Sequence, residues 1–277
     1  MAKRRRSRRR WRTDKEYLDL FLEPIRLCTD YLPKFGTDDE AGISLSEFRA
    51  LYGGDPLYHW IGFDSKLMFA AHKASGGITS LYRQLGIGCE RLVRRIIQDT
   101  LRLSDTEVSW SYQYKKTDGS RATITLDARI SLSEVRDSRR RNRVRSWLLR
   151  AANRIGLPSR RRRALSGVVF EVRQGYKSAD SKRQNADLRS AMRAYNQNLL
   201  PALMVVSGQI SNAVYVRYIA DQLLILKGVR SADSTVSTFA FCQRILGYSL
   251  SAFFERNATT LRREVLHIVR KLLSPSS

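Results

Sequence analysis

Cysteine, histidine and long apolar runs are scarce in this chain, and each shortage excludes a class of protein. There are 3 cysteines and 3 histidines among 277 residues, far apart and without any CxxC pair. Neither a structural zinc site nor a disulfide framework is therefore predicted. Free thiols are typical of a reducing compartment, and we expect a cytoplasmic protein. The residues concerned are Cys28, Cys89, Cys242, His59, His72 and His267.

Membrane, export and two common active-site signals are missing as well. No run of about 18 apolar residues is present, which predicts no membrane span. The arginine-rich N-terminus lacks the hydrophobic stretch of a secretory signal. Gly76-Gly77 is not part of a nucleotide-binding P-loop, and no GxSxG nucleophile elbow occurs. Cys89 lies on the expected buried side of a helix, where we interpret it as a structural thiol.

Positive charge dominates what is present. Lys and Arg number 50 against 26 Asp and Glu, a formal net charge of +24. Such an excess repels itself unless a polyanion neutralises it, so nucleic acid is the expected partner, with an anionic membrane surface as the alternative. Residues 1–13 form a basic arm, which we interpret either as a solvated tail or as a segment that binds phosphates. The arginines assigned to this arm are Arg4, Arg5, Arg6, Arg8, Arg9 and Arg10.

Hydrophobic periodicity predicts helices toward both ends of the chain. Residues 14–75 and 231–277 are expected to be helical regions that flank a central core at 76–230. The glycine pair Gly76-Gly77 predicts a turn, after which a long amphipathic helix begins. The helices expected before that turn span 14–31, 44–52 and 57–74.

The core region alternates strand and helix signals. VSWSYQYKK (108–116) and RATITLDARI (121–130) surround a Thr-Asp-Gly-Ser turn, which predicts a β-hairpin. GVVFEVRQGYK (167–177) and PALMVVSGQI (201–210) predict two further strands, each followed by a helix. We expect the second of these helices to span 211–228 and to end at the glycine there.

An arginine-dense insert at 134–163 separates the hairpin from these strands and is expected to form a basic helix with loops at both ends. The order of elements indicates a mixed α/β fold. Its centre would be a mixed sheet of about four to five strands flanked by helices.

Two carboxylates adjoin apolar strand segments in the core. Asp127 follows TITL, and Glu171 follows GVVF on the next predicted strand. A charge in such a position is costly unless it binds something. Two acids that converge from neighbouring strands are what Mg²⁺ requires to act on a phosphodiester. Alternatively, Asp127 faces water and Glu171 pairs with Arg173 or Arg129.

The hairpin with Asp127, the strand VVFEVRQGYK, the helix SKRQNADLRSAMRAY and the strand PALMVVSGQI together resemble the αβββαβ core of PD-(D/E)XK nucleases, over roughly residues 76–230. EVRQGYKSADSKRQNAD is most similar to type II restriction endonucleases of the ApaLI-like group. The resemblance implies a sequence-specific endonuclease for double-stranded DNA that uses Mg²⁺ and acts as a homodimer on a palindromic site. It implies that Asp127 and Glu171 are the metal ligands.

The sequence departs from the family pattern two residues after the second acid, where Arg173 stands in place of the usual lysine. Arginine holds a phosphate but does not act as a general base at neutral pH. Gln174 or Lys177 is then an alternative, although Lys177 is equally explained as an ordinary lysine at a strand end. Glu90 matches the family's further acid on the preceding helix, or else it forms an i,i+4 pair with Arg94.

Contacts with nucleic acid are also expected from the basic insert and from the start of the helix after 177. Arginines of the insert would bind the DNA backbone, and a helix start offers free N–H groups to a phosphate. Solvated helix faces explain both segments equally well. The competing function is a non-catalytic nucleic-acid-binding or packaging protein with an arginine-rich arm. The residues assigned to these contacts are Arg139, Arg140, Arg141, Arg183 and Gln184.

Overall fold

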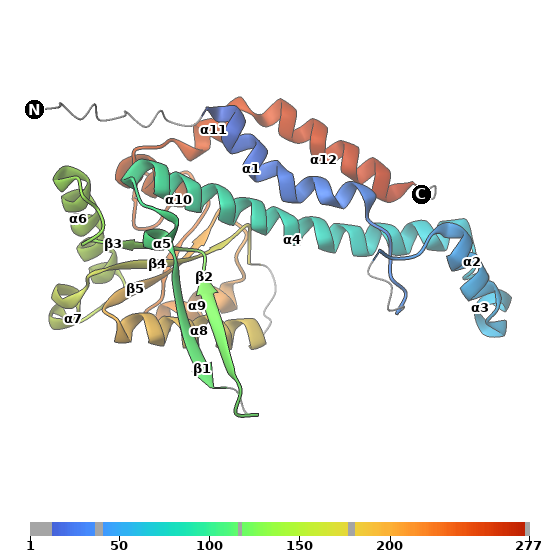
Figure 1. Ribbon diagram of the computed structural model, residues 1–277, viewed down its shortest axis with the longest axis horizontal. Coiled ribbons are helices and arrows are strands. Elements are labelled where there is room, and N and C mark those ends of the chain that lie inside the picture. Colours follow the sequence, from blue (N-terminus) through green and yellow to red (C-terminus); the bar gives the residue numbers. More distant parts are fainter. Residues whose placement is uncertain (1–12, 37–40, 116–117, 177–180, 275–277) are drawn as a thin grey trace, which may run out of the picture. The chain divides into compact units, whose positions relative to one another are not determined.

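A computed structural model describes residues 13–36, 41–115, 118–176 and 181–274 (Figure 1). Its contacts divide the chain into two compact units. One unit comprises Glu90–Ser251 with the chain up to Asp19, and the other comprises Leu20–Cys89 with Ala252–Ser277. The fold is mixed α/β, as the sequence predicts.

The first unit is built on a four-stranded mixed sheet in the order β3-β4-β5-β6. β3 runs antiparallel to β4, whereas β5 and β6 continue the sheet in parallel. Every residue of β5 is buried, as expected for a parallel strand covered on both faces. The strands are β3 (Ala128–Ser131), β4 (Gly167–Arg173), β5 (Leu199–Val205) and β6 (Leu224–Leu226).

The predicted hairpin is present as a separate two-stranded sheet. β1 (Trp110–Lys115) pairs antiparallel with β2 (Arg121–Leu126). Gly119 in the turn between them has φ +85°, a conformation that favours glycine. The strand expected over 121–130 is divided at Asp127, where the chain leaves the hairpin and enters the larger sheet. The break therefore falls on a residue that the sequence marks as a candidate ligand.

Helices cover both faces of the larger sheet. On one face, Phe170 of β4 packs against Phe241 with ring centroids 5.4 Å apart, and Trp147 lies 4.6 Å from the same ring. On the other face, Ala194 packs in one apolar cluster with Val169 of β4. The helices that supply these residues are α6 (Ser138–Arg154), α10 (Thr238–Phe241) and α8 (Ser181–Asn196).

The helix expected over 211–228 is wrong in its second half. The helix ends at Ala220, Gln222 adopts φ 58°, and the apolar run that follows forms β6 beside β5. Gly228 does not end a helix. Its α-carbon approaches the backbone of Val206 so closely that a side chain would collide there. The remaining elements of this unit are α5 (Asp105–Val108), α7 (Ser159–Ala164), α9 (Asn212–Ala220) and the π-helix η2 (Cys242–Leu246).

The second unit is helical. Phe48 and Phe69 are fully buried and pack with the ring of Phe35, and Ser44 and Glu47 cap the short helix predicted near 44–52. Three helices, α1, α4 and α11, contribute residues to both units. The elements are α1 (Asp14–Arg26), η1 (Leu27–Asp30), α2 (Leu45–Gly53), α3 (Pro56–Trp60), α4 (Lys66–Leu101), α11 (Leu250–Arg256) and α12 (Ala258–Leu273).

The turn predicted at Gly76-Gly77 is wrong, because α4 continues through both glycines. A side chain at Gly76 would collide with the hydroxyl of Tyr31, and one at Gly77 would collide with Leu272. Glycine in a helix interior costs about 1 kcal/mol relative to alanine. The pair is retained here because neighbouring elements pack directly on the helix backbone.

The three cysteines are free thiols, as expected, and all three are buried. Burial raises the pKa of Cys89 and of Cys242 to about 12, so neither thiol is a nucleophile at neutral pH. Within the described ranges, no helix combines the length and the apolar composition that a bilayer span requires. The basic arm from Arg4 to Arg10 lies outside the described residues, so its contact with phosphates stays a prediction.

Candidate active site

Asp127 is tied to β4 on both sides of Glu171. Its backbone N–H donates to the carbonyl of Phe170 at 3.1 Å, and its carboxylate accepts a 2.6 Å hydrogen bond from the N–H of Val172. The side chain thus continues the β3–β4 ladder where backbone pairing ends at Ala128. The guanidinium of Arg94 donates to the Asp127 carbonyl at 3.0 Å and fixes the same residue from α4.

Glu171 and Arg173 share one face of β4, since they are two residues apart on a strand. Their side chains form a 2.6 Å ion pair, and Arg173 also reaches Asp187 of α8 at 3.3 Å. The alternative that Glu171 pairs with Arg173 is therefore confirmed, whereas Arg129 donates to the Glu107 carbonyl instead. Nε of Arg173 is buried and has no hydrogen-bond partner among the described residues.

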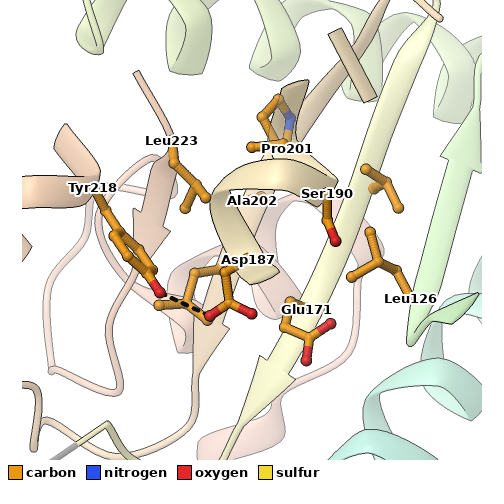
Figure 2. A pocket seen from close by; sticks show the side chains of 11 residues that line it. Leu126, Glu171, Asp187, Ser190, Pro201, Ala202, Tyr218 and Leu223 are labelled. Atoms are coloured by element: carbon orange, nitrogen blue, oxygen red, sulfur yellow. Dashed lines mark hydrogen bonds between the residues drawn. The ribbon is translucent and has the colours of Figure 1, made fainter. Parts of the chain in front are cut away.

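Asp187 is held by two tyrosine hydroxyls. Tyr218 donates to its carboxylate at 2.7 Å and Tyr176 at 3.2 Å, and the two hydroxyls lie 3.0 Å apart. Figure 2 shows Glu171 and Asp187 lining one pocket, from β4 and α8 respectively. The cavity measures about 20 Å³, which is room for about one water molecule. Arg173 is therefore held between the carboxylates of Glu171 and Asp187, and Asp187 is itself fixed by the two tyrosines.

Burial and mutual repulsion disfavour negative charge on the pair. Burial raises the pKa of Asp127, and the charges of Glu171 and Glu90 raise it further. Burial also raises the pKa of Glu171; Arg173 opposes the shift, while Asp187 and Glu90 reinforce it. Asp127, Glu171 and Glu90 therefore lie within electrostatic range of one another.

Glu90 is half-buried on α4. Burial raises the pKa of its carboxyl, against the lowering effect of Arg94 and Arg91. The alternative of an i,i+4 ion pair with Arg94 is wrong. Arg94 uses its guanidinium for the Asp127 and Asp105 carbonyls and the Ser109 hydroxyl, and the described chain shows no Glu90–Arg94 pair. Among the described residues, the Glu90 carboxylate has no hydrogen-bond or ion-pair partner, and it lies near the other two acids.

Lys177 and Gln184, which the sequence predicts near this site, are not found there among the described residues. Lys177 lies outside the described residues, so its role as a substitute for the family lysine stays a prediction. Gln184 is only 5% exposed, and its side-chain oxygen accepts from Arg217 at 3.2 Å, so it supports α9 and does not face a ligand. Arg183 is exposed, and its charge lowers the pKa of Glu171. Of the two DNA-contact candidates on α8, Arg183 is the one that faces solvent close to the acids.

The three arginines assigned to the insert have different surroundings. Arg139 is exposed. Arg140 donates its guanidinium to the Thr100 carbonyl at the end of α4, which is an internal contact. Arg141 is half-buried and donates to the Val135 carbonyl at 3.3 Å. Of these three arginines, only Arg139 is exposed to solvent and therefore accessible to a phosphate.

Comparisons of the chain with protein-family models, with curated proteins and with solved structures found no match. No family is therefore assigned. Nor do three or more His, Cys, Asp or Glu side chains form a metal-binding group in the part of the chain that the structure describes. The geometry provides a pair of half-buried acids, a third half-buried acid near them, and an arginine held between two carboxylates.

Sequence reasoning did not identify Asp187, Tyr176 or Tyr218. One signal was available for Asp187: it follows Arg183 by four residues, which puts both on one helix face. No local pattern marks the two tyrosines, because their hydroxyls meet only after β4, α8 and α9 have packed together.

Proposed function

We propose that this protein is a metal-dependent endonuclease of the PD-(D/E)XK type that hydrolyses double-stranded DNA. The observation that supports this best is the attachment of Asp127 to the residues on either side of Glu171, which joins two half-buried carboxylates at one point of the sheet. A half-buried acid pair in a protein of net charge +24 suits a phosphodiester substrate, whose phosphates the excess cations attract.

The donor set fits Mg²⁺, for which Asp127 and Glu171 are the ligands. Mg²⁺ prefers hard oxygen donors and binds through one or two carboxylates, with waters and substrate phosphates in its other positions, so a third acidic ligand is not required. Burial and repulsion raise the pKa of both carboxyls, and a cation relieves this strain. When bound, the metal supplies Lewis-acid activation of the phosphate and of a water.

Arg173 and Glu90 supply the charge stabilisation and the proton acceptor that the reaction also requires. Arg173 stays protonated and steadies the charge that develops on the phosphate, while Asp187 and Glu171 fix its guanidinium. Glu90 is free of hydrogen-bond partners in the described chain, is half-buried and has a raised pKa. It is the proposed acceptor of the proton from the attacking water. This assignment gives Glu90 the role that a lysine usually fills.

Exposed cations hold the DNA, and the proposed phosphate contacts among the described residues are Arg183, close to the acids, and Arg139 on α6. By the sequence resemblance, the enzyme is a type II restriction endonuclease. We extend the proposal to a cytoplasmic homodimer, because a palindromic DNA site is matched by two-fold symmetry.

One observation favours a second candidate, a non-catalytic nucleic-acid-binding protein. The Glu171 carboxylate is already neutralised by Arg173, and the described residues contain no three-ligand metal group. In that case the acids, Arg173 and Asp187 form an internal ion-pair network that only stabilises the sheet.

Cleavage assays on the full chain separate the two candidates. Purified protein is incubated with plasmid DNA, single-stranded DNA and RNA, each with Mg²⁺, Mn²⁺ or EDTA. The nuclease proposal predicts cleavage of the duplex with the metals and none with EDTA. It also predicts that Arg173→Lys, which restores the family residue, retains activity, and that Glu90→Gln lowers kcat. No cleavage of any substrate would favour the second candidate.

A further inference from the structure

A hollow lined by basic side chains lies between α6, α7 and the end of β3, away from the acids. Its volume is about 610 Å³, within the range of sites for small ligands. Four arginines line it: Arg141 and Arg145 from α6, and Arg162 and Arg163 from α7. None of its lining residues, all within the described chain, is acidic.

Two of these arginines are fixed by neutral partners. Arg141 donates to the Val135 carbonyl, and Arg162 donates to the side-chain oxygen of Asn153 and, at 2.8 Å, to the Ser159 hydroxyl. Such bonds orient a guanidinium without cancelling its charge. Because a guanidinium has five N–H donors, each arginine keeps donors for a ligand.

The other two arginines, Arg145 and Arg163, are exposed, and Nε of Arg163 donates to the Ser159 carbonyl at 3.5 Å. Across the described chain, none of the four guanidinium groups forms an ion pair with a carboxylate. Four like charges around one hollow repel one another, and an anion bound between them removes that repulsion.

Apolar side chains form the rest of the wall. Leu132 and Leu148 are buried, Leu165 is half-buried, and all three line the hollow. The frame is held by the short α6–α7 connection, in which Ile155 and Leu157 are buried and Gly156 adopts φ +74°. A ligand that matches this wall has a multiply charged anionic group and an apolar part.

We propose that this hollow is a nucleotide-binding site, in which the arginines bind a phosphate and the leucines contact the base. Arginine suits phosphate because its planar fork donates two parallel hydrogen bonds to it. The phosphate belongs either to a free mononucleotide or to a nucleotide within a nucleic-acid strand.

The hollow is distinct from the acid site. It adjoins Leu132 and Ser166, next to the Ser131–Gly167 pair of the β3–β4 ladder, whereas Asp127 and Glu171 lie beyond the other end of that ladder. Glu171 lies four residues along β4 from Gly167, which is about 13 Å at 3.3 Å per residue. The proposal therefore does not depend on metal binding or on cleavage.

Calorimetric titrations of the full chain in EDTA test it without any hydrolysis. The probes are adenosine 5′-monophosphate, adenosine and a short DNA duplex. The site variant is Arg145→Gln/Arg163→Gln, which removes two exposed charges from the hollow. The matched control is Arg143→Gln/Arg160→Gln, which removes two exposed charges from the same helices outside the hollow. Melting temperatures check folding, and the single charge reversal Arg145→Glu replaces the double variant if that one does not fold.

We expect the wild type to bind the monophosphate more tightly than adenosine, and the site variant to lose about tenfold or more of that affinity while the control changes less than about twofold. If only the duplex binds, and the site variant weakens it more than the control does, the phosphate comes from a strand. Equal losses in both variants for every probe, or no loss in the site variant, would overturn the proposal.

Discussion

The carboxylate of Asp127 accepts a 2.6 Å hydrogen bond from the backbone N–H of Val172, the residue that follows Glu171. A side chain here takes the place of a backbone carbonyl at the end of the β3–β4 ladder. Because Asp127 also donates its own N–H to Phe170, the position of its carboxylate relative to Glu171 is set by main-chain hydrogen bonds. The candidate site is therefore built into the pairing of two strands.

Stability of the metal-free protein should fall as pH rises. Burial, with the charges of Glu171 and Glu90, raises the pKa of Asp127 to about 8, above the ordinary value near 4 of an unfolded chain. When the pKa of an acid is higher in the folded than in the unfolded state, the folded state is stabilised in full at pH values below the unfolded pKa. That stabilisation is lost as pH rises from the unfolded pKa to the folded pKa. Between about pH 4 and pH 8 the free energy of unfolding should drop by on the order of 1 kcal/mol per pH unit.

Urea denaturation in EDTA at several pH values measures this slope. Asp127→Asn should flatten it, whereas Asp221→Asn, at an exposed position after α9, should leave it unchanged. Mg²⁺ should stabilise the wild type more at pH 8 than at pH 5, because it binds the ionised pair. The same slope in Asp127→Asn as in the wild type would contradict the account of this carboxyl.

Asp187 is a positioning residue for Arg173, and its charge also raises the pKa of Glu171. Asp187→Asn should lower the free energy of unfolding by about 2–4 kcal/mol, because the half-buried Arg173 loses one of its two anionic partners. It should also lower the pKa of Glu171 and move the acid limb of the pH–rate profile to lower pH.

Tyr218→Phe is the matched control for Asp187→Asn. It removes the 2.7 Å hydrogen bond to Asp187 but keeps the charge. It should cost about 1–2 kcal/mol of stability and leave the acid limb in place. A shifted limb in Tyr218→Phe, or an unshifted one in Asp187→Asn, would count against the electrostatic role of Asp187.

Neighbouring arginines of α6 should separate structural from DNA-binding roles. Arg140 is bonded to the Thr100 carbonyl, and Thr100 is fully buried. Arg140→Ala should therefore lower the free energy of unfolding by about 1–3 kcal/mol. Arg139→Ala removes the same charge from an exposed position and should change stability by less than about 0.5 kcal/mol while it weakens DNA binding and reduces its salt dependence. Thermal melts and binding isotherms at two salt concentrations distinguish these outcomes.

Local patterns predicted the elements on which the site depends. The hairpin, the strand with Glu171 and the buried strand after it each have alternating or continuous apolar residues and a clear turn or helix between them. These signals were enough to predict that Asp127 and Glu171 lie on neighbouring segments of the sheet. The pairing of Glu171 with Arg173 also follows from strand periodicity, since residues two apart share a face.

Errors arose where tertiary contact decides the local conformation. Gly76 and Gly77 have the signature of a turn, yet they lie in a helix because Tyr31 and Leu272 pack on its backbone. The three residues of β6 follow a helical pattern and become a strand only because β5 offers a free edge. The role of Asp187 likewise depends on tyrosines from two other segments. No short window of sequence contains that information.

Single-turnover cleavage of duplex DNA by Asp127→Asn tests the central claim most directly. The substitution removes one anionic oxygen ligand at little steric cost and leaves an oxygen that accepts from Val172. Wild type and Asp221→Asn should cut with Mg²⁺ at equal rates. Asp127→Asn should bind the same DNA at least as tightly and cut it at least about 100-fold more slowly. Cleavage by Asp127→Asn at the wild-type rate would show that the phosphodiester is hydrolysed somewhere else.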